Sequence, residues 1–309
     1  MLAVILNILF LVLGFIMLAK GSDWFVDGAA SIAAKFKIPQ LIIGLTVVAM
    51  GTSAPESAVS ITAAFGGSAD ITIGNVVGSN ILNVLIILGL TTVIIPIAVS
   101  RSILKIDTPF MIAITLLLLL LGLDGVVELY EGIILLVVFS AYITYLIISA
   151  KKNKEEPEKV KDLSTPIAIL LTAVGLGVVI LGSRFTVDTA TFLAQKIGLS
   201  ERFIGLTIVA LGTSLPELFT SVTAARKGNA DIAIGNIVGS NIFNILFVIG
   251  LSSLIIPVPF AKEFVFDFIV SIAAGVLLWL FSVKGKLHRR AGVVLLLGYA
   301  AYFVKILLY

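Results

Sequence analysis

The sequence predicts an all-α membrane protein of ten transmembrane helices, arranged as two inverted five-helix repeats. Three observations carry this prediction: an apolar composition, a series of segments long enough to cross a bilayer, and an internal repeat. Of the 309 residues, 59% are hydrophobic and only 13% are charged. Soluble domains carry about 45–50% apolar and about 25% charged residues. This deficit of charge argues against a soluble enzyme, and a lipid bilayer is the expected partner.

Ten segments qualify as candidate spans, because a transmembrane helix needs about 20 mostly apolar residues. They are 3–20, 40–65, 71–96, 107–123, 131–149, 166–182, 203–225, 232–257, 264–283 and 291–308. The amphipathic stretch 21–38 is a candidate extension of the first helix. The first segment has neither a positive n-region nor a small-residue cleavage site, so we expect it to be retained as a helix.

A short hydrophilic stretch, KKNKEEPEKVKD at 151–162, separates the two halves of the chain. We therefore expect a first five-helix repeat at 1–150, a cytoplasmic linker at 151–163 and a second, inverted repeat at 164–309. With the N-terminus outside, fifteen of the 21 Lys and Arg residues fall on the inner side and five on the outer side, with Lys20 at a helix end. Because basic residues favour the cytoplasmic side, the chain is expected to be a multi-pass plasma-membrane protein with both termini outside.

The second half repeats the first at an offset of 161 residues. Residues 44–90 and 205–251 align without a gap and are identical at 30 of 47 positions. The strongest matches are GTSAPE at 51–56 with GTSLPE at 212–217, and IGNVVGSNILN at 73–83 with IGNIVGSNIFN at 234–244. The offset holds five spans, an odd number, so the second copy must enter the membrane from the opposite side. Inverted repeats of this kind are typical of secondary transporters, which bind substrate near the bilayer midplane.

Each repeat places one glutamate, Glu56 or Glu217, inside an apolar segment. A charge at the centre of a membrane helix costs about 2.5–3.5 kcal/mol on insertion scales, and such residues usually face a pathway or a partner. Because the two positions are symmetric, we expect the carboxylates to meet with a cation between them, since like charges otherwise repel. The alternative is a pair of protonated, hydrogen-bonded structural glutamates.

Hydroxyl side chains precede each glutamate by about one turn, on the same helix face; they are Thr52, Ser53, Thr213 and Ser214. Pro55 and Pro216 carry no N–H, so the carbonyls of Gly51 and Gly212 lose their helical partners. The sequence therefore predicts a broken helix in each repeat, with freed carbonyls beside a carboxylate.

The second motif carries amides and hydroxyls on one helix stripe in each repeat: Asn75, Ser79 and Asn83, then Asn236, Ser240 and Asn244. Amides in membranes often serve only to join helices. That interpretation remains open for Asn75, Asn80, Asn236 and Asn241. A ligand role is favoured for the deeper residues Ser79, Asn83, Ser240 and Asn244.

The assembled set contains only oxygen ligands. The chain has no cysteine, and its single histidine, His288, lies in a basic run outside any apolar segment. Oxygen-only sites favour hard cations, and Ca²⁺ takes 6–8 oxygens in flexible geometry. Soft transition metals prefer other ligands. The two glutamates supply a charge of −2, which balances one Ca²⁺ or two monovalent ions.

The duplicated GTSxPE and GNxxGSNxxN motifs resemble the alpha-repeats of the cation/calcium exchanger superfamily, and most closely those of prokaryotic sodium/calcium exchangers. The resemblance covers essentially the whole chain and implies a site built from the second, third, seventh and eighth helices. It also implies that the first and sixth helices slide across the rest. Carried over position by position, the metal ligands are Thr52, Ser53, Glu56, Ser79, Asn83, Thr213, Ser214, Glu217 and Ser240, with the carbonyls of Ala49 and Ala210. Asn244, also expected in the site, stands where many members have Asp, which leaves the site one potential charge short.

The expected function is secondary antiport of Ca²⁺ against Na⁺, by alternating access at a midplane site. H⁺/Ca²⁺ exchange, K⁺-dependent exchange and a channel are the alternatives, and the hydroxyl-rich lining favours Na⁺. An enzyme is not expected, because HExxH and GxSxG motifs are absent. We expect no cofactor besides the transported ions, no nucleic-acid partner and no protein partner.

Overall fold

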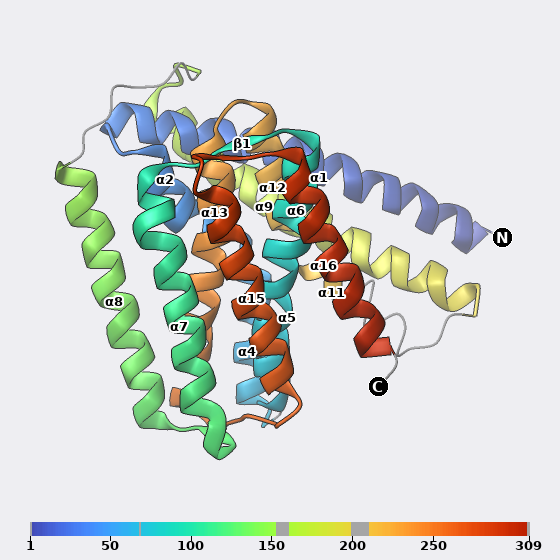
Figure 1. Cartoon of the computed structure of the whole chain (residues 1–309). Coiled ribbons are helices and arrows are strands. Elements are labelled where there is room, and N and C mark those ends of the chain that lie inside the picture. The colour runs from blue at the N-terminus through green and yellow to red at the C-terminus, as the bar shows by residue number, and fades with distance from the viewer. Residues whose placement is uncertain (1, 68, 153–160, 199–209, 308–309) are drawn as a thin grey trace.

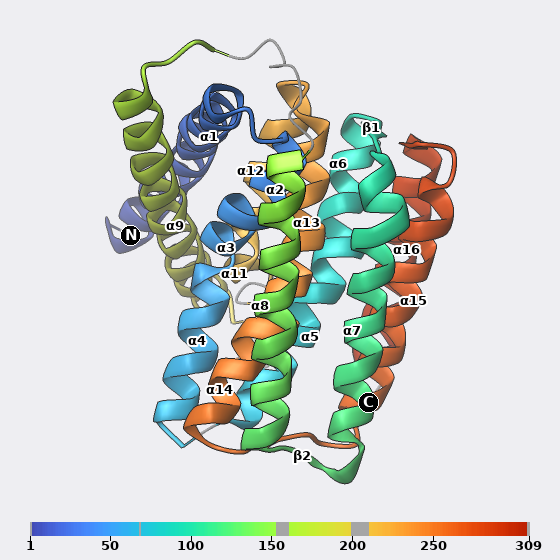
Figure 2. The same cartoon turned by 90° about the vertical axis from the view of Figure 1, so that its left-hand side faces the viewer.

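A computed structural model of the chain describes residues 2–67, 69–152, 161–198 and 210–307. Two long helices, α1 (Leu2–Phe36) and α9 (Thr165–Lys196), lie side by side on one flank of a bundle formed by the other helices (Figures 1 and 2). The stretch 21–38 continues the first helix as far as Phe36, as the sequence suggested.

The predicted sixth span, 166–182, is too short, because α9 continues to Lys196. The sequence beyond Gly182 is less apolar, yet its hydroxyl side chains are buried. Ser183 donates a hydrogen bond to the Gly212 carbonyl at 2.6 Å, and Thr186 donates to the Gly182 carbonyl at 2.8 Å. Polar residues therefore remain in the helix because backbone carbonyls satisfy them.

Small residues at intervals of seven allow α1 and α9 to pack closely as an antiparallel pair. Gly14, Gly21 and Gly28 face Gly182, Gly175 and Ala168, respectively. A Cβ added at Gly175 would lie 2.4 Å from the Phe25 backbone nitrogen, so no side chain fits there without a backbone shift. Small residues at such contacts are the usual means of bringing membrane helices together.

The predicted broken helix is present in both repeats. In the first, α2 (Gln40–Ile43), the π-helical η1 (Gly44–Val48) and α3 (Ala49–Thr52) lead to α4 (Ala54–Phe65), with a bend of 50° at the break. In the second, α11 (Ala210–Thr213) leads to α12 (Leu215–Arg226). The backbone leaves the helical region at Ser53 and at Ser214, and a proline follows each break inside the first turn of the next helix. Proline is tolerated there because its missing N–H would be unpaired in any case.

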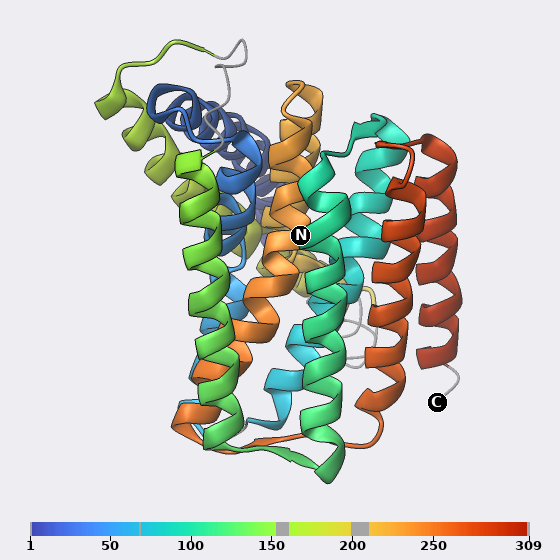
Figure 3. The ribbon, with the colours of Figure 1, turned by 60° about the vertical axis from the view of Figure 1, so that its left-hand side comes forward.

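The best-buried spans form the centre of the bundle (Figure 3). One runs through α5 (Asp70–Leu82), η2 (Asn83–Leu88) and α6 (Gly89–Ile94); the other runs through α13 (Ala230–Phe243), η6 (Asn244–Ile249) and α14 (Gly250–Ile255). Both η2 and η6 are π-helical turns that begin at the equivalent residues Asn83 and Asn244. Such turns occur frequently at functional sites.

The outer helices complete the bundle. They are η3 (Ile103–Asp107), α7 (Thr108–Leu121), η4 (Gly122–Asp124), α8 (Leu129–Lys152), α15 (Phe264–Ser282) and α16 (Arg289–Leu307). Helix α8 ends two residues into the stretch predicted as the linker. Two short antiparallel ladders join the repeats: β1 (Ile97–Ala98) with β4 (Lys286–Leu287), and β2 (Val126–Val127) with β3 (Val258–Pro259).

Within the described part of the chain, seven helices are long and apolar enough to cross a membrane, or eight if the bent pair at 40–65 counts as one span. Two of the ten predicted spans are not among these eight helices. The segment 203–225 begins among residues outside the described ranges, and 291–308 corresponds to α16, which carries Arg289, Arg290 and Lys305. The protein is therefore a predominantly helical membrane protein.

Candidate metal centre

The two glutamates occupy equivalent places at the helix breaks. Glu56 lies in the first turn of α4 and Glu217 in the first turn of α12, and each residue is only 1% exposed. The N-terminus of a helix carries a partial positive charge that stabilises a nearby carboxylate. The position of each acid at a helix N-terminus thus offsets part of the cost of burying a carboxylate.

Hydroxyl groups bind each carboxylate from the opposite repeat. The Ser53 hydroxyl donates to Glu217 Oε1 at 2.9 Å, and the Ser214 hydroxyl donates to Glu56 Oε1 at 3.2 Å. The carboxylates are near enough for their charges to interact. The structure therefore brings Glu56 and Glu217 together, as the symmetry of the sequence predicted.

Four buried oxygen atoms around this centre have no hydrogen-bond partner among the described residues. They are Oε2 of Glu56, Oε2 of Glu217, Oδ1 of Asn83 and Oδ1 of Asn244. Each repeat supplies one carboxylate oxygen and one amide oxygen, and the two pairs occupy equivalent positions in the repeats. A buried acceptor without a partner costs about 1–3 kcal/mol, and more when it is charged. A hard cation is the partner that oxygen acceptors of this kind satisfy best.

A ring of four amides fixes the two asparagine oxygens. The Asn80 and Asn241 side-chain nitrogens each donate to the other residue's backbone carbonyl, both at 3.2 Å. The Asn241 side-chain oxygen accepts from Asn83 at 2.9 Å, and the Asn80 side-chain oxygen accepts from Asn244 at 3.2 Å. Because the nitrogens of Asn83 and Asn244 are held in this ring, their oxygens are the atoms left without partners. Asn80 and Asn241 thus join the repeats, which is the structural role that the sequence left open.

Asn75 and Asn236 position the glutamates through the backbone. Asn75 donates to the Glu56 carbonyl at 3.0 Å and to the Ser60 hydroxyl at 2.9 Å. Asn236 donates to the Glu217 carbonyl at 3.4 Å and to the Ser221 hydroxyl at 2.9 Å. Ser60 and Ser221 lie outside the motifs from which the site was predicted. They could have been found, because each lies one turn after a glutamate and is identical in the two repeats.

The two copies of the site differ in their contacts. In one, the Ser240 hydroxyl donates to the Ala49 carbonyl at 3.4 Å, and both residues are fully buried. In the other, Ser79 lines a cavity of about 190 Å³ together with Thr213 and residues of α16. Ala210, the repeat equivalent of Ala49, begins α11. Ser240 is therefore hydrogen-bonded to the first repeat, whereas Ser79, although buried, borders a cavity.

The remaining expected ligands are buried at the same centre. Thr52, Ser53 and Ser214 are 0–3% exposed, and the Thr52 hydroxyl bonds Asn236 Oδ1 at 2.9 Å. Across the described ranges, no group of three or more His, Cys, Asp or Glu side chains is placed to hold a metal ion. A cation at this centre would thus be bound by two carboxylates and a larger number of neutral oxygens.

The chain matches the sodium/calcium exchanger protein family over residues 6–148 and 167–308. It is 39% identical to the putative antiporter CaxA of Alkalimonas amylolytica, over 95% of this chain and 96% of that protein. It is 33% identical to the sodium/calcium exchanger MaX1 of Methanosarcina acetivorans, over 96% of this chain and 97% of that protein.

The fold is similar to that of the sodium-calcium exchanger NCX_Mj, in a structure soaked with 2.5 mM Na⁺ and 10 mM Sr²⁺. The TM-score is 0.86 at 34% identity, covering 97% of this chain and 99% of the other. The family match, the full-length relatives and this structural similarity agree with the duplicated motifs. The chain belongs to the sodium/calcium exchanger family.

Proposed function

We propose that this protein is a secondary antiporter that exchanges Ca²⁺ for Na⁺ at the centre formed by Glu56 and Glu217. The observation that carries the proposal is the set of four buried oxygens without partners, arranged as two symmetric pairs. A protein that never bound a cation there would leave these acceptors unsatisfied in a low-dielectric interior, at a cost of about 1–3 kcal/mol each.

The charge of the site explains why exchange is favoured over release. Two carboxylates in this buried place repel one another unless positive charge lies between them. One Ca²⁺ or two Na⁺ ions neutralise that charge equally well. The site is thus stable when it holds either set of ions and unstable when empty, so one ion leaves as the other arrives.

The proposed ligands are side-chain and main-chain oxygens from both repeats. They are the side chains of Thr52, Ser53, Glu56, Ser79, Asn83, Thr213, Ser214, Glu217, Ser240 and Asn244, with the carbonyls of Ala49 and Ala210. Metals that prefer nitrogen or sulfur are disfavoured by such a set.

The proposed architecture has ten spans in two inverted repeats, with both termini outside the plasma membrane. In this orientation the Ser79 cavity lies toward the outside, and the Ser240–Ala49 contact closes the inner side. Movement of α1 and α9 across the bundle would reverse this asymmetry. The contact difference between the repeats supports alternating access, since one sequence motif adopts two arrangements in the same molecule.

Calcium uptake into proteoliposomes tests this proposal. We expect ⁴⁵Ca²⁺ to accumulate when an outward Na⁺ gradient is imposed, and not when an outward K⁺ or H⁺ gradient replaces it. Glu128→Gln is the matched control for Glu217→Gln, because Glu128 is an exposed carboxylate in the α7–α8 turn. Sodium-driven uptake should survive in the control and be lost in Glu217→Gln. Uptake that needs no counter-gradient would identify a channel and refute antiport.

A further inference from the structure

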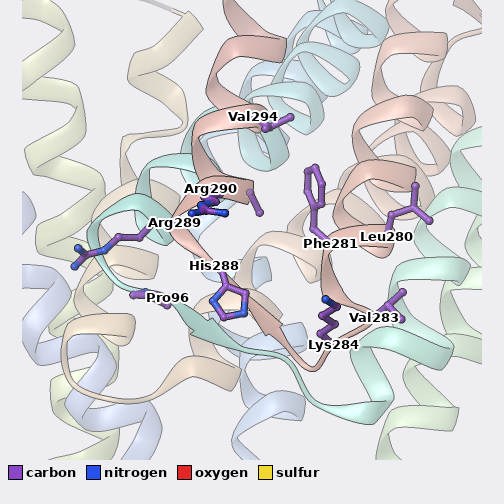
Figure 4. Close-up of a pocket in the computed structure, with 10 residues that line it drawn as sticks. Pro96, Leu280, Phe281, Val283, Lys284, His288, Arg289, Arg290 and Val294 are labelled. Carbon is purple, nitrogen blue, oxygen red and sulfur yellow. The ribbon is translucent and has the colours of Figure 1, made fainter.

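A second cavity, of about 970 Å³, lies at the end of the bundle where β1 pairs with β4. It is bordered by Pro96 after α6, by the last turn of α15 and by the first turns of α16 (Figure 4). Cavities of about 300–1,000 Å³ are the size that proteins use for small ligands. None of the proposed ion ligands lines it.

The rim of this cavity is basic. Lys284, His288, Arg289 and Arg290 line it, and its lining contains no acidic residue among the described residues. Arg289 donates to the Ile94 carbonyl at 3.3 Å, which holds its guanidinium at the end of α6. Where the structure describes the chain, no carboxylate lies within 4.0 Å of Lys284, His288 or Arg290. Figure 4 shows these three side chains around the cavity.

The wall beneath the rim is apolar and accessible. Leu280 is 53% exposed, Val283 is 57% exposed and Val294 is 43% exposed, and Phe281 stands between them in Figure 4. A hydrophobic wall directly below a cluster of cations matches a molecule with an anionic head and an apolar tail.

The opposite end of the molecule supplies an internal comparison. There the α7–α8 turn has the same backbone: Phe260 N–H donates to the Gly125 carbonyl at 2.8 Å, as Val99 N–H donates to Gly285 at 2.9 Å. Acidic residues replace basic ones there: Asp124 and Glu128 occupy the places of Lys284 and His288. The fold of the turn therefore does not require basic residues. The preference for basic residues on the cytoplasmic side accounts for the sign of the charges but not for the cavity or its wall.

We propose that this cavity binds an anionic phospholipid of the inner leaflet. Its phosphate would lie between Lys284, His288 and Arg290, and an acyl chain would lie along Leu280, Val283 and Val294. Basic pockets between transmembrane helices on the cytoplasmic side are suited to anionic headgroups. The proposal rests on the orientation given above and is independent of ion exchange, so the two can fail separately.

Native mass spectrometry of the purified protein tests this inference, with phosphatidylglycerol and phosphatidylcholine offered in equal amounts. We expect the wild type to retain phosphatidylglycerol preferentially. Lys284→Gln/Arg290→Gln should weaken retention roughly thirtyfold, the equivalent of about 1 kcal/mol for each basic residue. Lys151→Gln/Lys152→Gln, which removes two charges from the inner end of α8, should retain the lipid as the wild type does.

A second variant tests the apolar wall. Val294→Trp keeps every charge but fills the cavity, and we expect it to lose phosphatidylglycerol while melting at the wild-type temperature without lipid. Inorganic phosphate should not displace the lipid at millimolar concentration. The inference is overturned if both pocket variants retain phosphatidylglycerol normally, if phosphatidylcholine binds as tightly, or if inorganic phosphate displaces the lipid.

Discussion

At the scale of single residues, each glutamate is bound by hydroxyl groups of the opposite repeat rather than of its own. Ser53 bonds Glu217 and Ser214 bonds Glu56. The sequence predicted that these four residues share a site, because they share a motif. It did not predict that the hydrogen bonds cross between the repeats, because spacing along a helix describes only neighbours on that helix.

We expect Ser53→Ala and Ser214→Ala to weaken calcium binding to a similar degree. Each change removes a hydrogen bond to a charged group, worth about 1.5–3 kcal/mol, so the affinity should fall by a factor of ten or more. Isothermal titration with Ca²⁺ measures the effect. Ser140→Ala is the control, since its hydroxyl bonds only the Leu136 carbonyl of its own helix. Wild-type affinity in both site variants would show that the cross-repeat bonds are unimportant.

We expect Asn244→Asp to change ion coupling more than folding. The new carboxyl group would join Glu56 and Glu217 in one buried centre and raise its potential charge to −3, which favours an additional cation or a proton. Calcium uptake should acquire a new dependence on K⁺ or on pH, whereas Asn229→Asp, in the turn before α13, should not. Unchanged Na⁺, K⁺ and pH dependence in Asn244→Asp would contradict this account.

At the scale of elements, α1 and α9 are joined tightly to one another and are mostly exposed to the outside of the bundle. Their contact is made through glycines, at positions where a side chain would meet backbone. The sequence contains these glycines, but α9 was predicted to end at 182, because the hydropathy of the sequence falls beyond that residue. Hydrophobicity alone cannot detect a helix whose polar residues are satisfied by neighbouring carbonyls.

Gly175→Ala should destabilise the α1–α9 pair. The added methyl would lie 2.4 Å from the Phe25 nitrogen, and overpacking of this kind typically costs about 1–3 kcal/mol. The melting temperature in detergent should therefore fall. Gly177→Ala is a close control, because no atom lies within 4 Å of its added Cβ. If both variants melt alike, the glycine contact does not stabilise the pair.

Charged contacts connect the C-terminal half of α1 to the rest of the molecule. Lys227 Nζ lies 2.7 Å from Asp27 Oδ1, and Lys161 Nζ lies 2.7 Å from Asp27 Oδ2. The bond to Asp27 raises the pKa of the Lys161 ammonium. The contribution of this pair to stability is thus complete below the ordinary lysine pKa of about 10.4 and is lost as the pH rises through the higher folded value.

Asp27→Asn should loosen the C-terminal half of α1 by breaking both contacts. Hydrogen exchange of residues 23–36 should accelerate in this variant at neutral pH. Its repeat equivalent, Asp188, is exposed and makes no ion pair with any described residue, so exchange in Asp188→Asn should match the wild type. Identical exchange in all three proteins would show that the ion pairs do not hold α1.

At the scale of the whole molecule, two nearly identical motifs adopt different contacts. The sequence predicted the helix breaks and the meeting of Glu56 with Glu217, because each follows from the repeat itself. The inversion of the second copy stays a prediction. It could not predict which copy is closed, since the residues that close one side recur on the other. The Ser240–Ala49 contact and the Ser79 cavity distinguish the copies only in the folded structure.

Equilibrium binding of ⁴⁵Ca²⁺ to the purified protein tests the central claim most directly, because it isolates the site from transport. We predict that Glu56→Gln and Glu217→Gln each abolish saturable binding, that Glu128→Gln leaves it unchanged, and that Na⁺ displaces bound Ca²⁺ from the wild type. Near-normal binding in either buried variant, with the protein folded, would contradict the account of two converging acids that hold one shared set of ions.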